Sequence, residues 1–171
     1  MTLPDVGYFN FNALESNLGV SGHEKGINMN DIILSIEEHS CNAKDVPEIK
    51  SDYGSFEGFR IVTNQQEILL LIDNQQNCCE DWGYFMSEDE FSGFIKAELL
   101  DISITDEALN EAKMKEHDID DKSKLYEGGM MFVDIKTSYG VLQFVAYNEH
   151  NGYYSHDAVV ISRQLNHRES L

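Results

Sequence analysis

Apolar runs of strand length fill the last third of the chain, residues 132–162, and two short turn signals separate them. The first signal is Ser138-Tyr139-Gly140, a three-residue loop whose glycine stands where a left-handed residue closes a hairpin. The second is Asn151-Gly152, the dipeptide that most strongly favours a two-residue hairpin. The pattern therefore predicts a meander of three consecutive antiparallel strands.

A two-residue turn at Asn151-Gly152 fixes which residues of the last two strands face each other. Tyr147 is then opposite His156, and Glu149 is opposite Tyr154. Because side chains alternate between faces, one face is expected to carry Asn148, His150, Tyr153, Ser155 and Asp157. Farther from the turn, the core is expected to hold the pairs Val145/Ala158, Phe144/Val159 and Leu142/Ile161. The turn end should therefore be polar and aromatic.

Shorter apolar patterns upstream predict four more strands. Residues 31–38 are rich in β-branched isoleucine, which favours a strand over a short helix. Residues 58–63 and 66–73 predict a second hairpin, in which the stretch EILLLID is apolar on both faces. Residues 96–105 alternate between polar and apolar positions. In this last strand the residues expected to face the core are Leu100, Ile102 and Ile104.

Two short helices are expected at the periphery. Ser87 and Glu90 have the spacing of a capping box, and Met86 with Phe91 has that of a hydrophobic staple, so a helix should begin at Ser87. Residues 106–116 are good helix formers with a thin apolar stripe, which is typical of a surface helix.

These elements predict an α+β, β-rich fold with a mostly antiparallel sheet that ends in the three-stranded meander. Residues 31–171 are interpreted as a single domain, in which residues 106–128 form an insertion with a helix and an acidic loop. Residues 1–30 show no clear periodicity, and we interpret them as a loosely structured lead-in.

The charge balance narrows the classes of partner. The 171 residues include 12 Lys and Arg against 31 Asp and Glu, a formal net charge of -19. Because phosphate contacts need basic side chains, nucleic acid and anionic membrane surfaces are not expected as direct partners. Two interpretations of the acidity stay open: a solvated surface that maintains solubility, or a face that docks on a basic protein.

The sequence also predicts a cytoplasmic protein. No apolar run approaches the roughly 20 residues of a membrane span, and residues 1–17 lack the pattern of a signal peptide. Three cysteines, Cys41, Cys78 and Cys79, have no framework spacing, which is typical of reduced thiols.

Cys78 and Cys79 are the first candidates for chemistry. Adjacent side chains on a strand point to opposite faces, so the two thiols are not expected to hold one metal together. Three interpretations stay open: small buried hydrophobic residues, a mixed Cys/His metal site, or a reactive thiol with a histidine base. The partners available to a reactive thiol are His156, His150, Asp157 and Glu149.

Two observations weaken the metal and thiol interpretations. Glu80 and Asp81 lie beside the thiols and should raise their pKa, which opposes thiolate formation. His150 and His156 are expected on opposite faces of the ribbon, and the sequence has no CxxC, HExxH, nucleotide-binding or serine-hydrolase motif. The sequence therefore predicts neither a metal site nor a cofactor.

The aromatic turn end is the candidate binding surface. Tyrosine and tryptophan side chains rimmed by acids are typical of surfaces that bind a protein or a small ligand. The same residues could instead stabilise the hairpin through their own cross-strand pairs. The candidates are Tyr147, Glu149, His150, Asn151, Tyr153, Tyr154 and His156, with Trp82 and Tyr84 beside them if the strand after the cysteines neighbours the meander.

Two motifs, Cys78-Cys79-Glu80 and Asn151-Gly152-Tyr153-Tyr154-Ser155, resemble those of a family of small uncharacterised proteins from bacteria and their phages. The resemblance spans about residues 32–162 and implies a mostly β fold, without any activity, cofactor or catalytic residue. We therefore favour a non-enzymatic acidic interaction module, of accessory, immunity or phage counter-defence type, that binds a basic protein. The alternative is a small enzyme with a cysteine nucleophile and a histidine base.

Overall fold

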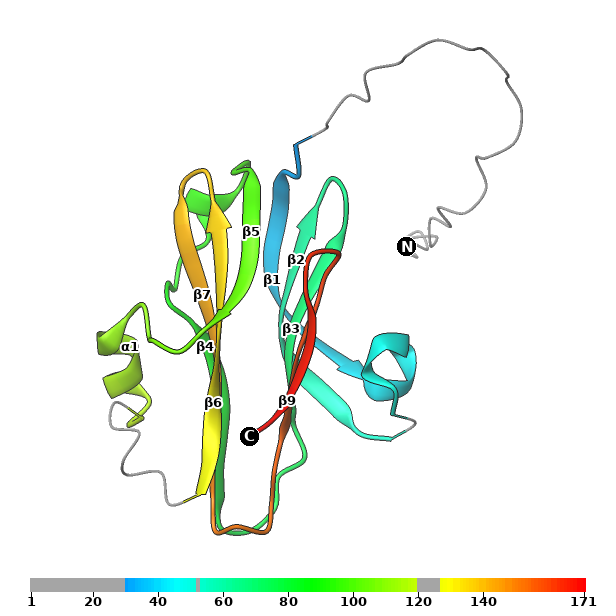
Figure 1. The fold of residues 1–171 in the computed structure, drawn as a ribbon, viewed down its shortest axis with the longest axis vertical. Helices are drawn as coiled ribbons and strands as arrows, with labels where there is room; N and C mark the ends of the chain where they lie inside the picture. The colour runs from blue at the N-terminus through cyan, green and yellow to red at the C-terminus, as the bar shows by residue number, and fades with distance from the viewer. Residues whose placement is uncertain (1–29, 52, 120–126) are drawn as a thin grey trace, which may run out of the picture.

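Two antiparallel β-sheets packed face to face form the protein, as Figure 1 shows. The computed structural model describes residues 30–51, 53–119 and 127–171. The five-stranded sheet has the order β1 (Ile33–Asn42), β2 (Ser55–Thr63), β3 (Glu67–Asp73), β8 (Asp157–Ile161) and β9 (Asn166–Ser170). The four-stranded sheet has the order β4 (Glu80–Met86), β7 (Gly140–His150), β6 (Glu127–Thr137) and β5 (Leu99–Thr105).

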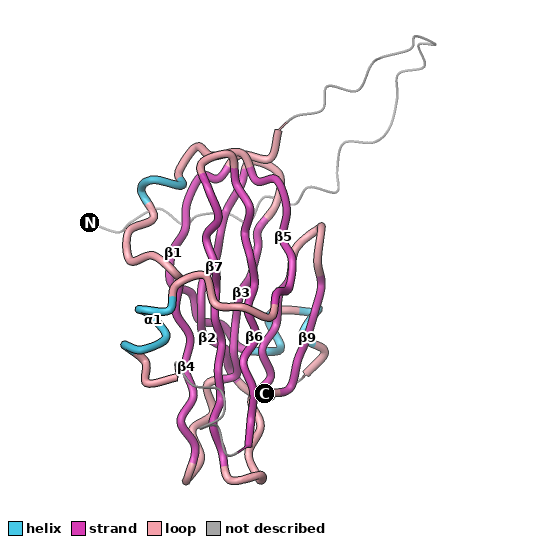
Figure 2. Tube along the Cα trace, turned by 60° about the vertical axis from the view of Figure 1, so that its left-hand side comes forward, coloured by secondary structure: helices cyan, strands magenta, loops and turns pink. Residues whose placement is uncertain are grey.

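The main hydrophobic core lies between the two sheets. Leu70 of β3 and Val160 of β8 are fully buried from one side, and Phe144 of β7 is fully buried from the other. The strands run roughly along the long axis of the molecule in both layers (Figure 2). Both sheets thus bury most of their facing side chains, which explains the predominance of apolar residues in the central strands.

Short helical segments cover part of each outer face. On the five-stranded sheet, η1 (Ala43–Asp45) and η2 (Pro47–Ile49) pack over Phe56 and Leu71. On the four-stranded sheet, α1 (Glu111–Glu116) places Met114 over Phe85 and Val145. The central strands β3 and β7 are therefore apolar on both faces, as EILLLID predicted for β3.

Two of the predicted hairpins form. β2 pairs with β3, and β6 pairs with β7. The turn of the second hairpin is Ser138-Tyr139, one residue shorter than predicted, because Gly140 already pairs with Thr137. In the first hairpin Gly58 is needed for close approach, since a Cβ there would lie 2.0 Å from the carbonyl oxygen of Leu70.

The third strand of the predicted meander is wrong. β8 leaves the sheet of β7 and pairs with β3 and β9 in the other sheet, so Asn151-Gly152 is not a two-residue hairpin. Two facts explain the change: β4 occupies the free edge of β7, and β8 packs Val159 and Val160 into cores on opposite faces. The predicted opposition of Tyr147 with His156 and of Glu149 with Tyr154 is wrong for the same reason.

The predicted helix at Ser87 is also wrong. The Ser87 backbone donates to Gln143, and the Ser87 hydroxyl accepts from the Gln143 backbone at 3.0 Å, so the capping side chain continues the β4–β7 pairing instead. Only a 3-10 turn, η3 (Ser92–Phe94), follows. Tertiary hydrogen bonds here prevail over a local helix signal.

The predicted alternation of β5 fails at its start. The register with β6 shifts between Leu99 and Asp101, which turns Leu99 inward and leaves Leu100 58% exposed. Ile102 is buried as predicted, whereas Ile104 is 37% exposed.

The second predicted helix is shorter than residues 106–116, since α1 begins at Glu111 after Asn110, whose side chain accepts from two backbone N–H groups. The predicted lead-in, apart from Asn30, and much of the predicted acidic loop lie outside the described residues.

Candidate functional site

Two connections between the sheets meet at one end of the sandwich, the lower end in Figure 1. Residues 74–79 join β3 to β4, and residues 151–156 join β7 to β8. We call this end the tip and include in it the adjoining strand residues Glu80, Asp81, Glu149 and His150. The strand after the cysteines does neighbour β7, with Trp82 opposite Asn148. The tip therefore gathers the two motifs that the sequence singled out.

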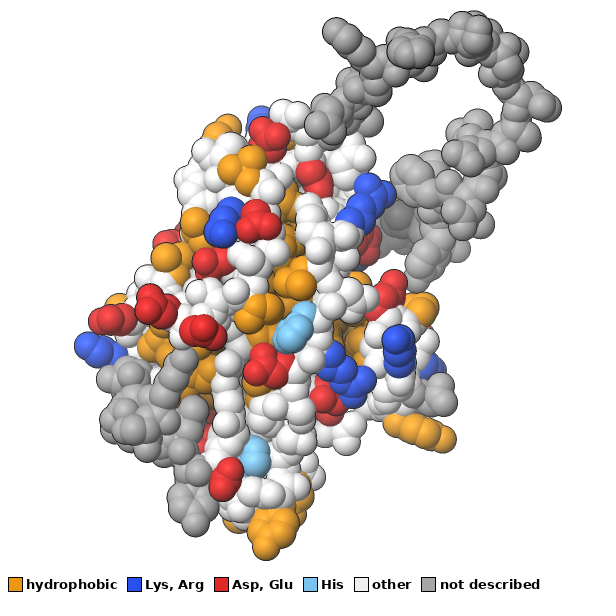
Figure 3. All heavy atoms as spheres, viewed as in Figure 1, with side chains coloured by type: hydrophobic (Ala, Val, Ile, Leu, Met, Phe, Trp, Pro, Cys, Tyr) orange, Lys and Arg blue, Asp and Glu red, His pale blue; other side chains and the backbone are white. Residues whose placement is uncertain are grey.

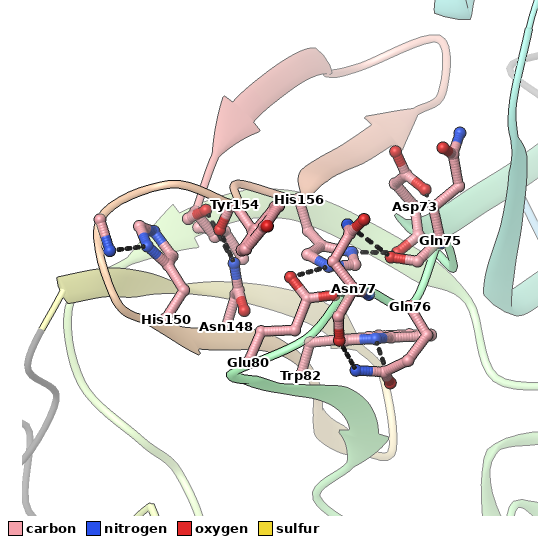
Figure 4. Close-up of polar contacts among 12 residues, drawn as sticks. Asp73, Gln75, Gln76, Asn77, Glu80, Trp82, Asn148, His150, Tyr154 and His156 are labelled. Carbon is pink, nitrogen blue, oxygen red and sulfur yellow. Dashed lines mark hydrogen bonds and ion pairs between the residues drawn. The ribbon is translucent and has the colours of Figure 1, made fainter.

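A buried contact between a histidine and a carboxyl group lies beneath the surface of the tip (Figure 4). The side chains of His156 and Glu80 are 1% and 0% exposed, and Nε2 of His156 lies 3.1 Å from Oε2 of Glu80. Nδ1 of His156 is 2.5 Å from the carbonyl oxygen of Asp73, which can only accept, so this nitrogen carries a proton. A second proton, on the ring or on the carboxyl group, is then needed to make the contact with Glu80 attractive.

Further contacts enclose this pair on both sides. The Trp82 ring stacks on His156 with centroids 4.9 Å apart, and its Nε1 donates to Gln76 at 3.0 Å. Glu80 also accepts from the backbone N–H of Asn77. The ring of His156 thus contacts the end of β3 and the start of β4, and the pair links the two sheets.

Asn148 ties the second connection to the last strand. Its Nδ2 donates to the carbonyl oxygens of Tyr154 and Leu171 at 3.1 and 3.2 Å. The backbones of His156 and Leu171 also exchange two hydrogen bonds. Since Asn148 is fully buried, its amide needs these partners, and the contacts therefore define the path of residues 154–156.

The two cysteines lie in an exposed turn, so the expectation that they sit on a strand with one thiol packed inward is wrong. Cys79 adopts a left-handed conformation with φ of 62°. A hydrogen bond with the Cys78 thiol raises the pKa of Cys79, and another raises the pKa of Tyr154. The direction for Cys79 was predicted, but its main cause is the neighbouring thiol rather than the acids at positions 80 and 81.

The histidines named as possible bases are occupied elsewhere. Both ring nitrogens of His156 face other groups, and Nδ1 of His150 accepts from the backbone N–H of Gly152 at 2.8 Å. Asp157 pairs with Arg168. Within the described ranges no hydrogen bond joins either thiol of the tip to a histidine. The structure therefore does not assemble a cysteine, a base and an orienting acid.

The predicted binding residues divide between the surface and the interior. At the surface, Tyr153 is 83% exposed and Tyr154 is partly exposed. Glu149, His150 and Asn151 line a shallow depression of about 460 Å³ together with Cys79, Glu80 and Asp81.

Tyr147 and His156 are buried, and Trp82 supports the histidine. Tyr147 lies across Gly83, where an added Cβ would come within 2.6 Å of its hydroxyl oxygen. Burial raises the pKa of Tyr147.

Tyr84 belongs to a different site, a cleft of about 400 Å³ beside β4. The cleft has an aromatic wall, in which Phe59 makes edge contacts with Tyr84 and Phe91, and Phe85 stacks on His117 at 4.3 Å. The charged residues that line it are Glu38, Glu88, Asp89, Lys113 and Glu116. Sequence reasoning missed this cleft because it assigned residues 87–91 to a helix.

Charge on the face seen in Figure 3 is mixed. On the face seen in Figure 3, acidic side chains are scattered among Lys and Arg rather than gathered in one patch. In the described part of the chain, no three potential ligands cluster in a way that could hold a metal. The helices of that part are too short or too polar to cross a membrane.

Comparison with known proteins gives one match. The family model described as "Domain of unknown function (DUF7448)" matches residues 32–160, which include β1 to β7 and most of β8. No curated protein and no solved structure matches the chain.

Proposed function

Since the chain belongs to the family described as "Domain of unknown function (DUF7448)", we propose its role from its own geometry: a non-enzymatic interaction module whose tip binds a basic protein. The observation that carries this proposal is a rigid buried support beneath an exposed aromatic surface. The Glu80–His156 pair and Asn148 hold the connections from below, while Tyr153 projects into solvent. A tyrosine side chain supplies a large contact area at low entropic cost, because it has only two rotatable bonds.

The charge of the tip agrees with a basic partner. Asp81 and Glu149 line the shallow depression, and among the described residues no Lys or Arg lines it. Such a surface attracts a positively charged protein over a distance set by the salt concentration. We further propose that the protein acts in the cytoplasm of a bacterium or of a phage-infected cell, as an accessory, immunity-type or phage counter-defence protein. The bacterial or phage setting rests on the resemblance of the two motifs, Cys78-Cys79-Glu80 and Asn151-Gly152-Tyr153-Tyr154-Ser155.

Quantitative capture from a host-cell extract tests the proposal. Wild type should retain one or more basic proteins that Tyr153→Ala loses. Tyr139→Ala is the matched control, because Tyr139 is also an exposed turn tyrosine, at 63%, but lies at the far end of β7. If both variants captured equal amounts of these proteins, the tip would not be part of the interface.

The alternative, a cysteine nucleophile with a histidine base, makes the opposite prediction about thiol reactivity. The raised pKa of Cys79 lowers its thiolate fraction at neutral pH. We therefore expect Cys78 and Cys79 to react slowly and similarly with an alkylating reagent near pH 7. One fast cysteine, with a rate that His156→Gln lowers, would favour the enzyme instead.

A further inference from the structure

The strand β4 has a free edge beside the cleft. It pairs with β7 along one side and is the first strand of its sheet. In the described part of the chain, the other side of β4, from Glu80 to Met86, pairs with no strand. Among the described residues, no backbone hydrogen bond outside the regular elements reaches this side. A free strand edge presents unpaired N–H and C=O groups that can accept another strand.

The cleft surrounds this edge on both sides of the strand. Tyr84 points to the interior side, where it meets Phe59 of the opposite sheet, and Phe85 points to the outer side, where it meets His117. A segment added along β4 would send successive side chains to these two sides in turn. The cleft is therefore shaped to receive the side chains of an added strand, not only its backbone.

The lining favours basic side chains. Among the described residues that line the cleft, four carboxylates stand against one lysine, Lys113, whose ammonium group pairs with Asp89 and lies 3.2 Å from Glu116. Lys113 thus offsets the charges of Asp89 and Glu116. Glu38 and Glu88 remain exposed. Burial raises the pKa of Tyr84, and the charges of Glu57 and Glu38 add to this effect. An arginine or lysine would meet both carboxylates and aromatic faces here.

We propose that the edge of β4 binds an extended basic segment of a protein partner as an additional strand, with its basic side chains in the cleft. The site is centred on residues 84–86 of β4, whereas the tip includes only Glu80 and Asp81 at the start of that strand. It shares with the proposed function only the basic character of the partner, and it can be tested without the tip.

The probe is a hexapeptide that alternates arginine and valine, acetylated and amidated at its ends. Its affinity is measured by calorimetry, and the amides that respond are identified by ¹⁵N NMR. We expect saturable binding with shifts centred on β4, and a loss of at least about tenfold, or 1.4 kcal/mol, when alternate peptide nitrogens are methylated. Methylation keeps the charge and removes the strand hydrogen bonds.

Two variants localise the site. Glu38→Gln with Glu88→Gln, both at exposed positions, should weaken the peptide several-fold, whereas Glu149→Gln at the tip should leave it unchanged. Several outcomes would overturn the inference: no saturable binding, equal binding of the methylated peptide or of arginine amide, or shifts centred on residues 149–156 of the tip. A tip that fails to capture a partner, together with a peptide that binds β4, would reject the proposed function and keep this site.

Discussion

The two connections that flank β7 carry similar turn signals but are built differently. At one end, Ser138-Tyr139 joins β6 to β7 as a hairpin, and its turn is held by its neighbours: Thr137 Oγ1 donates to the Gly140 carbonyl at 2.8 Å and accepts from Tyr139. At the other end, residues 151–156 cross to the opposite sheet and are held by Asp73, Glu80 and Leu171. One turn is local, and the other depends on long-range contacts.

The difference shows what a turn signal can report. A Gly-containing dipeptide reports that the backbone can reverse its direction. It does not report which strand will pair next, because that depends on which edges are already taken. The tip therefore needs a buried polar network to define its conformation, whereas the hairpin does not.

The largest expected loss of stability comes from a substitution in the main core, which lies between the two sheets. Phe144 is fully buried between the sheets and contacts the rings of Phe59 and Tyr84. Phe144→Ala should lower the free energy of unfolding by about 3 to 5 kcal/mol. Urea denaturation measures this loss, and a value below about 1 kcal/mol would mean that the sheets do not pack through this residue.

The next effect separates the two connections. Glu80→Ala leaves His156 buried without its partner and should cost about 3 kcal/mol. Thr137→Ala, which removes the corresponding contacts of the hairpin turn, should cost only about 1 kcal/mol. Denaturation of both variants, with the double variant Glu80→Ala and His156→Ala to measure coupling, checks the contrast. Equal losses would mean that the tip is no more dependent on its side chains than the hairpin.

A smaller effect is the pH dependence of stability that arises from Asp73, whose backbone carbonyl contacts His156. Burial raises the pKa of Asp73, so the folded state holds this proton more tightly than the unfolded chain. The resulting stabilisation is complete below the unfolded pKa of about 3.9 and is lost as pH rises through the folded pKa.

Asp73→Asn should therefore gain stability relative to wild type between pH 3 and pH 6. We expect a gain below about 1 kcal/mol, because solvent screens this partly exposed group. Urea titrations across this range measure the difference, and a constant difference would contradict the pKa shift.

Much of the fold could be predicted because its signals are local. The β2–β3 and β6–β7 hairpins each combine apolar runs with an adjacent turn, and their register follows from both. The position of β8 and the existence of β9 could not be derived, since Arg168 and its neighbours in β9 alternate between exposed and partly buried side chains without an apolar face. The Ser87 signal failed because its hydroxyl had a partner 56 residues away.

The tip could be predicted only in part, because only its turn signals are local. The motifs around Cys79 and Gly152 mark the two connections. They do not reveal that His156 points into the protein towards Glu80, or that Tyr147 is buried on the outer face of the four-stranded sheet. Both side chains belong to types that serve equally well in a core and at a surface, and only the pairing of strands decides between these roles.

The most direct test of the binding role is a titration of the captured partner. Wild type, Tyr154→Ala and the control Tyr139→Ala are compared at two salt concentrations. Tyr154→Ala removes a partly exposed side chain outside the strands and should cost the fold only about 0.5 kcal/mol, yet weaken binding by about 2 kcal/mol or more if the tip is the centre of the interface. The account predicts this loss for Tyr154→Ala alone, with weaker binding at higher salt. Equal affinities for the three proteins, or affinity that salt does not change, would contradict it.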